Sequence, residues 1–350
     1  MVFPLGRQTL MDRLAGGKAP LRLEEGDGEG LGLPPALGMH ISRRFRRLDP
    51  SVHALAWSGD GRCLAAGGSD GAIRVDDYES GEPMALLKHH ARSVTALAWS
   101  PDERSLASGG GEGSIAVWDT SQWKMRIAVE GAFLYPVTAL AWSPSGAFCA
   151  SAHAEPRVWI WEASRWKTQG WLEGHGTGAS CLAWKDHRHL ATGGMDGRLR
   201  LWDAFSRKTL WDVPGHAGGV RALLVSPDGR WLATAGADGM LRVWSSESGE
   251  MIREAQAHSG PVSALTASHE GAFLATRGDD GRVRIWDARR WEALAMLEGK
   301  PAPAGPLQFH PFLLLLAATD PWEKRVQVYQ LESDPPEERT DWGERRKAAC

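Results

Sequence analysis

The chain has 350 residues, of which 43% are hydrophobic, and its formal net charge is −3. This hydrophobic share can bury a large core, and a net charge near zero argues against general binding to nucleic acids or other polyanions. The longest apolar run, Phe312–Ala318, is far shorter than the roughly 20 residues that a membrane-spanning helix needs. We therefore expect a globular, cytoplasmic protein that does not associate with membranes.

Cysteine usage excludes two further classes of protein. The four cysteines form no C-x-x-C pair and do not have the spacing of metal ligands: Cys63, Cys149, Cys181 and Cys350. So few cysteines in so long a chain argue against a disulfide framework. No metal ion or other cofactor is expected.

The two ends of the chain differ from the part between them. Within residues 1–39, Gly26–Gly38 has the glycine, proline and acidic composition of a linker, and Phe3–Leu14 has apolar residues at helical spacing. This segment is either a mobile tail, as chain ends usually are, or an arm that docks on a partner. Residues 332–350 are charged and predicted to be a solvated tail. The folded domain is expected over residues 40–331.

The first segment of this domain, His40–Arg47, has strand character and contains the strongest basic cluster, Arg43–Arg47. The cluster has two interpretations. It protects the outer edge of a sheet with charge, a common device against unwanted strand pairing. Alternatively, it binds an acidic protein segment or a phosphate backbone.

From about residue 50 to residue 330, one pattern recurs seven times. Each unit has an apolar run such as Val94–Trp99, a small-residue run such as Ser105–Gly109, and an alternating run that ends at an aromatic position. These end positions are spaced by 42, 43, 41, 42, 42 and 43 residues: Asp76, Trp118, Trp161, Trp202, Trp244, Trp286 and Tyr329. Alternating runs between Gly and Asp turns are typical of hairpins. We predict an all-β repeat protein with four strands in each unit.

The repeats resemble those of the WD-repeat family over residues 40–330. The dipeptide Trp-Asp stands at 118–119, 202–203 and 286–287, and Gly-His stands at 174–175 and 215–216. The resemblance implies a seven-bladed β-propeller. It also implies that His40–Arg47 becomes the outer strand of the last blade, pairs with Arg325–Leu331 and closes the ring.

In this family a Trp, a hydroxyl, a His and an acid of each unit form a buried hydrogen-bonded network, which fixes the strand register when every group is paired. The resemblance implies this structural role in the second, fourth, fifth and sixth units for His90, Ser108, Glu112, Trp118, His175, Thr192, Asp196, Trp202, His216, Thr234, Asp238, Trp244, His258, Thr276, Asp280 and Trp286. Histidines that recur at the blade period lie around a ring, so they cannot converge on one metal ion.

The other units are predicted to be degraded. Asp76 replaces the Trp of the first unit, and Phe133 stands where the third unit should have its His. Counting ten residues back from the aromatic position gives Thr319 as the hydroxyl of the seventh unit.

Members of the family usually bind partners on the top face, at the loops that enter the inner strands. One position there is Thr or Ser in four units but His53 in the first and Arg221 in the fifth. Arginines and aromatic residues are favoured at binding hot spots. The candidate contacts are therefore His53, Phe133, Tyr135, Arg221, Arg277, Asp320 and Trp322. Alternatively, these residues reflect drift in degraded repeats, or Arg277 and Asp320 form a pair that ties two blades together.

Three functions remain. The first is a non-enzymatic scaffold that binds a protein or peptide on its top face, as a monomeric propeller within a larger complex. The second is an enzyme or small-ligand binder at the central channel. Gly67–Gly71 matches the Gly-x-Ser-x-Gly nucleophile motif, but this segment is a predicted hairpin tip and lacks the strand–turn–helix context that the motif requires. The third is a nucleic-acid-associated factor that uses Arg43–Arg47, although nucleic acid is not the partner that the composition favours.

Overall fold

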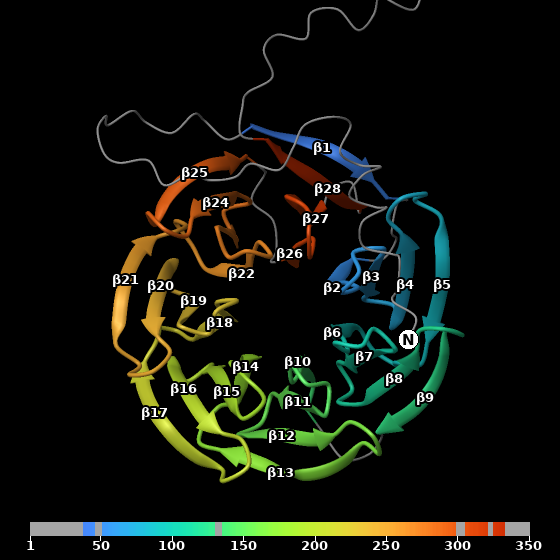
Figure 1. Ribbon diagram of the computed structural model, residues 1–350, viewed down its shortest axis with the longest axis horizontal. Helices are drawn as coiled ribbons and strands as arrows, with labels where there is room; N and C mark the ends of the chain where they lie inside the picture. The colour runs from blue at the N-terminus through green and yellow to red at the C-terminus, as the bar shows by residue number, and fades with distance from the viewer. Residues whose placement is uncertain (1–37, 46–50, 130–134, 299–304, 321–324, 333–350) are drawn as a thin grey trace, which may run out of the picture. The chain divides into compact units, whose positions relative to one another are not determined.

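The computed structural model describes residues 38–45, 51–129, 135–298, 305–320 and 325–332. The chain divides into two compact units, residues 1–34 and 35–350, and all the described residues belong to the second. Their regular secondary structure consists of strands, which form seven four-stranded antiparallel sheets (Figure 1). The sheets follow one another around a ring as the blades of a propeller. The all-β, seven-bladed prediction is confirmed.

Each blade runs from an inner strand near the centre of the ring to an outer strand at the rim. Blades 1 and 2 comprise β2 (Val52–Trp57), β3 (Cys63–Gly68), β4 (Ala72–Asp77) and β5 (Pro83–Lys88), then β6 (Val94–Trp99), β7 (Ser105–Gly110), β8 (Ile115–Asp119) and β9 (Lys124–Val129). Blades 3 and 4 comprise β10 (Val137–Trp142), β11 (Phe148–His153), β12 (Arg157–Glu162) and β13 (Lys167–Glu173), then β14 (Ala179–Trp184), β15 (His189–Gly194), β16 (Arg198–Asp203) and β17 (Lys208–Pro214).

The remaining blades repeat this order. Blades 5 and 6 comprise β18 (Val220–Val225), β19 (Trp231–Gly236), β20 (Met240–Ser245) and β21 (Met251–Gln256), then β22 (Val262–Ala267), β23 (Phe273–Gly278), β24 (Val283–Asp287) and β25 (Glu292–Leu297). Blade 7 comprises β26 (Leu307–Phe309), β27 (Leu315–Asp320), β28 (Arg325–Glu332) and β1 (Gly38–Arg44).

Burial follows the position of a strand within its blade. The second strand, such as β7, is small and entirely buried, because blades pack on both of its faces. The outer strand, such as β21, is largely exposed and carries both polar and apolar residues. The apolar clusters therefore lie mostly between neighbouring blades. No helix in the described part of the chain is long and apolar enough to cross a membrane.

The ring closes as predicted, because β1 pairs antiparallel with β28 on the rim of blade 7. At the end of β1, Phe45 is only 3% exposed and packs in a cluster that includes residues of both blades 1 and 7. Arg43 donates a hydrogen bond to the carbonyl of Glu79 in blade 1, at 2.7 Å, and its guanidinium lies 5.5 Å from the centre of the Tyr78 ring. This arginine therefore fastens the seam between blades 7 and 1.

Two repeated side chains bind blade to blade. The indole N–H groups of Trp99, Trp142 and Trp184 each donate to an alanine carbonyl of the preceding inner strand, at 3.0, 3.0 and 3.1 Å. On the other end of the inner strands, Thr95 and Thr138 donate to carbonyls of the next blade at 2.6 and 2.7 Å, and Ser180 does the same. These hydroxyls are thus structural.

Blade 7 departs from the expected alignment. Tyr329 pairs with Leu316 just as Trp286 pairs with Leu274, so the register places Ala318, and not Thr319, in the hydroxyl position. The assignment of Thr319 was wrong because the connection between β27 and β28 is one residue longer than in blade 6. The inner strand β26 is also short, and it lacks the part that meets the preceding blade elsewhere in the ring.

Candidate interaction face

The polar network of each intact blade is a chain of three hydrogen bonds. In blade 5 the indole N–H of Trp244 donates to Thr234 Oγ1 at 2.8 Å, the Thr234 hydroxyl donates to His216 Nε2 at 2.8 Å, and His216 Nδ1 donates to Asp238 at 2.8 Å. The structure brings together the equivalent predicted residues in blades 2, 4 and 6: His90, Ser108, Glu112, Trp118, His175, Thr192, Asp196, Trp202, His258, Thr276, Asp280 and Trp286.

The network holds its histidine neutral. Burial lowers the pKa of His216, and the hydrogen bond to Asp238 only partly offsets this effect. Burial alone would raise the pKa of Asp238, but hydrogen bonds from Arg242 and His216 outweigh it and keep that pKa below its usual range. Such a histidine is a fixed hydrogen-bond relay. Among the described residues, no cluster of three or more His, Cys, Asp or Glu side chains could hold a metal ion.

Blade 3 is not degraded in the way that its sequence predicts. Its Trp161 donates to Ser151 Oγ at 2.9 Å, and Ser151 is 3.1 Å from His153 Nε2. His153 Nδ1 is 3.4 Å from the backbone carbonyl of Tyr135, to which it donates. The histidine of this network therefore comes from the second strand, and Phe133, which lies outside the described residues, does not decide whether the network forms.

A glycine explains why this histidine was missed. In blade 5 the position equivalent to His153 is Gly236, and a Cβ there would lie 2.3 Å from His216 Cγ. Gly194 and Gly278 leave room for His175 and His258 in the same way. A side chain is possible at this position only when the loop histidine is absent. The exchange of Gly for His within one unit was the available sequence signal.

The top face is the end of the ring that carries the tips between second and third strands, such as β7 and β8, and the loops that enter the inner strands. The structure leaves Arg221 exposed there, at the position where Thr95, Thr138 and Ser180 bind the next blade. No hydrogen bond or ion pair of the Arg221 side chain occurs among the described residues. His53 is exposed at the same position of blade 1, with its Nε2 3.3 Å from Ser51 Oγ.

The prediction that Arg277 is an exposed contact residue was wrong. It is only 5% exposed, and its guanidinium donates to the carbonyl and hydroxyl oxygens of Thr319 at 2.7 and 3.1 Å. Its guanidinium lies beside Gly305, just before the short β26, so it joins blades 6 and 7 and is not an exposed contact. Its hydrogen bonds go to Thr319, whereas Asp320 accepts a hydrogen bond from Gln327. Trp322 lies outside the described residues.

Two features of this face were not predicted. The first is Met195 in the tip of blade 4, which is 48% exposed and therefore as accessible as the predicted contact Tyr135, at 49%. The second is the pair of loops that enter blades 4 and 5. Their exposed residues include the small Gly176, Thr177, Ala217 and Gly218. A methionine inside a repeated Gly-x-Asp-Gly tip gives little signal in a sequence.

Comparisons with known proteins agree with this architecture. A family model described as "WD domain, G-beta repeat" matches residues 81–119, 130–162, 166–203, 207–245 and 249–287. A second model, "Anaphase-promoting complex subunit 4 WD40 domain", matches residues 44–95. No curated protein matches the chain.

A solved structure shows the same fold. The crystal structure of the Myceliophteria thermophila Cps50 (Swd1) β-propeller domain superimposes with a TM-score of 0.76 at 21% identity, covering 84% of this chain and 100% of that one. Together, the repeated motifs, the blade networks and a family match over more than half of the sequence show that this chain belongs to the WD-repeat family.

Proposed function

We propose that this propeller is a non-catalytic platform that binds a segment of a partner protein on its top face, above blades 3 to 5. One observation carries the proposal: Arg221 is exposed and unpaired among the described residues, at a position where other blades use a hydroxyl to join their neighbour. An arginine that contributes nothing to the ring is available for a carboxylate of a partner.

The surroundings of Arg221 favour a peptide over a small molecule. Met195 offers an adaptable apolar contact, and its backbone lies beside Gly219, two residues before Arg221. The small residues of the neighbouring loops let the backbone of a partner approach closely. Tyr135 adds an exposed aromatic side chain above blade 3. Arginine, methionine and aromatic residues are enriched at protein interfaces.

The central channel gives less support to catalysis. Among the described inner-strand positions at its top end, only His53 and Arg221 are ionisable, and they belong to blades 1 and 5. WD-repeat propellers are generally non-catalytic scaffolds. The second family model is named after a subunit of a multiprotein complex, which favours the same role for this chain.

Arg43 is less available for the alternative function, nucleic-acid binding. Arg43 is held at the blade seam by Glu79 and Tyr78, and only Arg44 of the described part of the cluster is free to face solvent. Arg46 and Arg47 lie outside the described residues. We therefore rank this function below the protein platform.

The proposal is tested by affinity capture from a lysate of the source cells with quantitative mass spectrometry. The baits are the wild-type chain, Arg221→Ala, Met195→Ala and a matched control, Arg230→Ala, which removes an exposed arginine from the opposite face. We expect at least one partner to be lost with both top-face variants and kept with the control. The proposal fails if every captured protein is kept by both top-face variants.

A further inference from the structure

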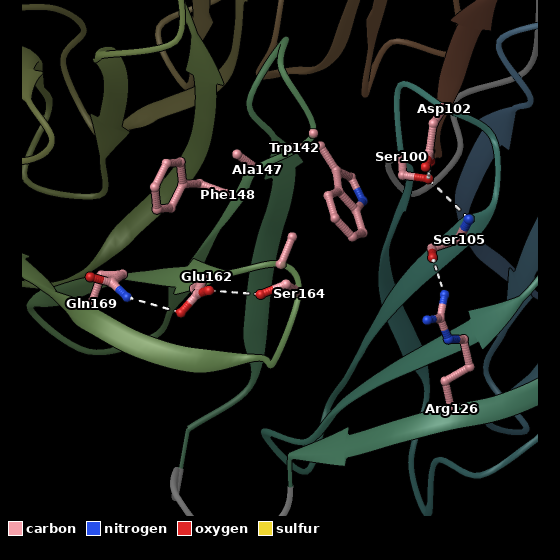
Figure 2. Close-up of a pocket in the computed structure, with 12 residues that line it drawn as sticks. Ser100, Asp102, Ser105, Arg126, Trp142, Ala147, Phe148, Glu162, Ser164 and Gln169 are labelled. Carbon is pink, nitrogen blue, oxygen red and sulfur yellow. Dashed lines mark hydrogen bonds between the residues drawn. The ribbon is translucent and has the colours of Figure 1, made fainter.

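A cleft of about 570 Å³ opens between blades 2 and 3 on the face opposite to the top face (Figure 2). One wall comes from blade 2 and carries Ser100, Ser105 and Arg126. The other comes from blade 3 and carries Trp142 and Glu162. We call this the Arg126 cleft. Its volume falls in the range of sites that bind ligands or peptide side chains.

The internal repeat explains why the cleft exists. The first residue of the second strand is Phe148, Trp231 and Phe273 in blades 3, 5 and 6, and these large side chains occupy the space next to the following blade. In blade 2 the same position is Ser105. The cleft therefore opens where Ser105 replaces the large rings of blades 3, 5 and 6; in blade 1 the small Cys63 stands at this position, beside a smaller pocket of about 160 Å³.

Arg126 is a second departure in the same place. The equivalent positions on the outer strands of blades 4, 5 and 6 are apolar, namely Leu210, Ile252 and Leu294. The guanidinium of Arg126 forms one long hydrogen bond, to Ser105 Oγ at 3.4 Å, and no ion pair among the described residues.

One hydrogen-bond donor beside Arg126 has no acceptor among the described residues. Ser105 is only 8% exposed, and its hydroxyl hydrogen has no acceptor in the described part of the chain. Asp119, which lies within the electrostatic reach of Arg126, already accepts bonds from Ser121 and Gln122. A guanidinium and a free hydroxyl that meet at one point favour an oxygen anion.

The other charges in the cleft disfavour a phosphate more strongly than a carboxylate. Asp102 accepts from Ser100 at 2.6 Å, and Glu162 accepts from Ser164 at 2.7 Å. Hydrogen bonds lower the pKa of Asp102, so it keeps its negative charge. Two carboxylates at the walls repel a doubly charged phosphate about twice as strongly as a singly charged carboxylate. Between the polar groups, Trp142 offers an aromatic surface that suits an apolar side chain, whereas the Phe148 ring packs on Phe205 of blade 4.

We propose that the Arg126 cleft binds a peptide segment of a partner protein that presents an Asp or Glu to Arg126 and Ser105 and packs a neighbouring apolar side chain on Trp142. This site is separate from the top face and does not depend on the function proposed for that face. A propeller with both sites would hold two different segments on opposite faces.

The test uses a displayed library of random twelve-residue peptides, selected on the immobilised full chain, with affinities of enriched peptides measured by fluorescence anisotropy. The variants replace cleft residues with ones that the repeat carries elsewhere: Arg126→Leu, as in blade 4, and Ser105→Phe, as in blade 3. Arg253→Leu, on the exposed outer strand of blade 5, is the control. We expect peptides with an acid beside an apolar residue, whose affinity falls at least about tenfold in both cleft variants and is unchanged in Arg253→Leu and Arg221→Ala.

Two results would overturn the proposal. One is a selection that yields no peptides with this pattern. The other is binding that Arg126→Leu leaves unchanged. If Ser105→Phe lowers the melting temperature, Arg126→Leu decides alone, because Arg126 is an exposed side chain whose loss does not disturb the core. Loss of binding in Arg221→Ala with retention in Arg126→Leu would assign the peptides to the top face and reject the cleft.

Discussion

Blades 3 and 5 form the same buried network, but their histidines come from different segments of the blade. In blade 5 the imidazole comes from the loop that enters the blade, as His216, and its Nδ1 faces a carboxylate. In blade 3 it comes from the second strand, as His153, and its Nδ1 faces a backbone carbonyl. In both, the Trp N–H is paired through a hydroxyl. In these two blades an imidazole fills the same place in the network, and two sequence positions can supply it.

The largest expected effect comes from placing both histidines in one blade. Gly236→His should destabilise the protein by about 4 kcal/mol, because its Cβ would lie 2.3 Å from His216 Cγ. Adding His216→Phe, which copies the arrangement of blade 3, should recover more than about 1 kcal/mol. Urea unfolding of the two single variants and the double variant measures this coupling. Strictly additive effects would mean that the two arrangements are unrelated.

The next effect tests the hydroxyl that both blades share. Thr234→Val keeps the side-chain shape but removes the group that pairs Trp244 and His216, so we expect a loss of about 2–3 kcal/mol. Thr209→Val, on the exposed outer strand of blade 4, is the control and should change the unfolding free energy by less than about 0.5 kcal/mol. Equal unfolding midpoints for the two variants would contradict the structural role of the network.

A pH titration separates the two histidines. Burial lowers the pKa of His153 to about 4, against roughly 6.5 in the unfolded chain, so the unfolded state binds more protons between these values. Stability should therefore fall as pH decreases from 6.5 towards 4. His153→Gln should reduce this fall by about 1–2 kcal/mol at pH 5. His216→Gln should reduce it less, because Asp238 offsets part of the burial effect. Thermal unfolding as a function of pH distinguishes the two, and the reverse order would refute the comparison.

The smallest effect concerns the group that Nδ1 faces. Tyr135 contributes its backbone carbonyl, and its side chain is half exposed, so Tyr135→Ala should change stability by less than about 0.5 kcal/mol. Asp238 contributes its side chain, so Asp238→Ala should cost about 1–2 kcal/mol. Both values come from chemical denaturation, and a Tyr135→Ala variant that is as unstable as Asp238→Ala would show that the phenol ring supports blade 3.

The sequence predicted the ring, its seven blades and the closing strand, because strand alternation and the spacing of the aromatic positions recur in every unit. It also predicted the networks of blades 2, 4, 5 and 6, whose residues stand at constant offsets. It failed where offsets change. One extra residue before β28 moved Thr319 out of the hydroxyl position, and Arg277, which looked like an exposed anchor, is buried and bonded to Thr319 of blade 7. His153 was missed because a residue from another strand fills the place of the loop histidine.

The candidate sites were predicted less well than the fold. Arg221 and Tyr135 were found as deviations from the repeat, and the structure leaves both exposed. Met195 and the Arg126 cleft were not found, although Ser105 and Arg126 also deviate from their equivalents. That deviation becomes visible only when the strand register aligns the outer strands, since their sequences share no motif.

The ring can close only after β28 has been synthesised, because β28 is the partner of the closing strand β1. During synthesis β1 leaves the ribosome first, and its partner β28 follows only after some 280 residues. At translation rates of about 5–20 residues per second, this delay is on the order of tens of seconds. Blades 1 to 6 can form in that time, while β1 remains an unpaired strand that is open to pairing with the wrong edge. Charges on an edge strand oppose such pairing, and β1 carries Arg43 and Arg44. In the finished ring Arg43 and Phe45 hold β1 against blade 1.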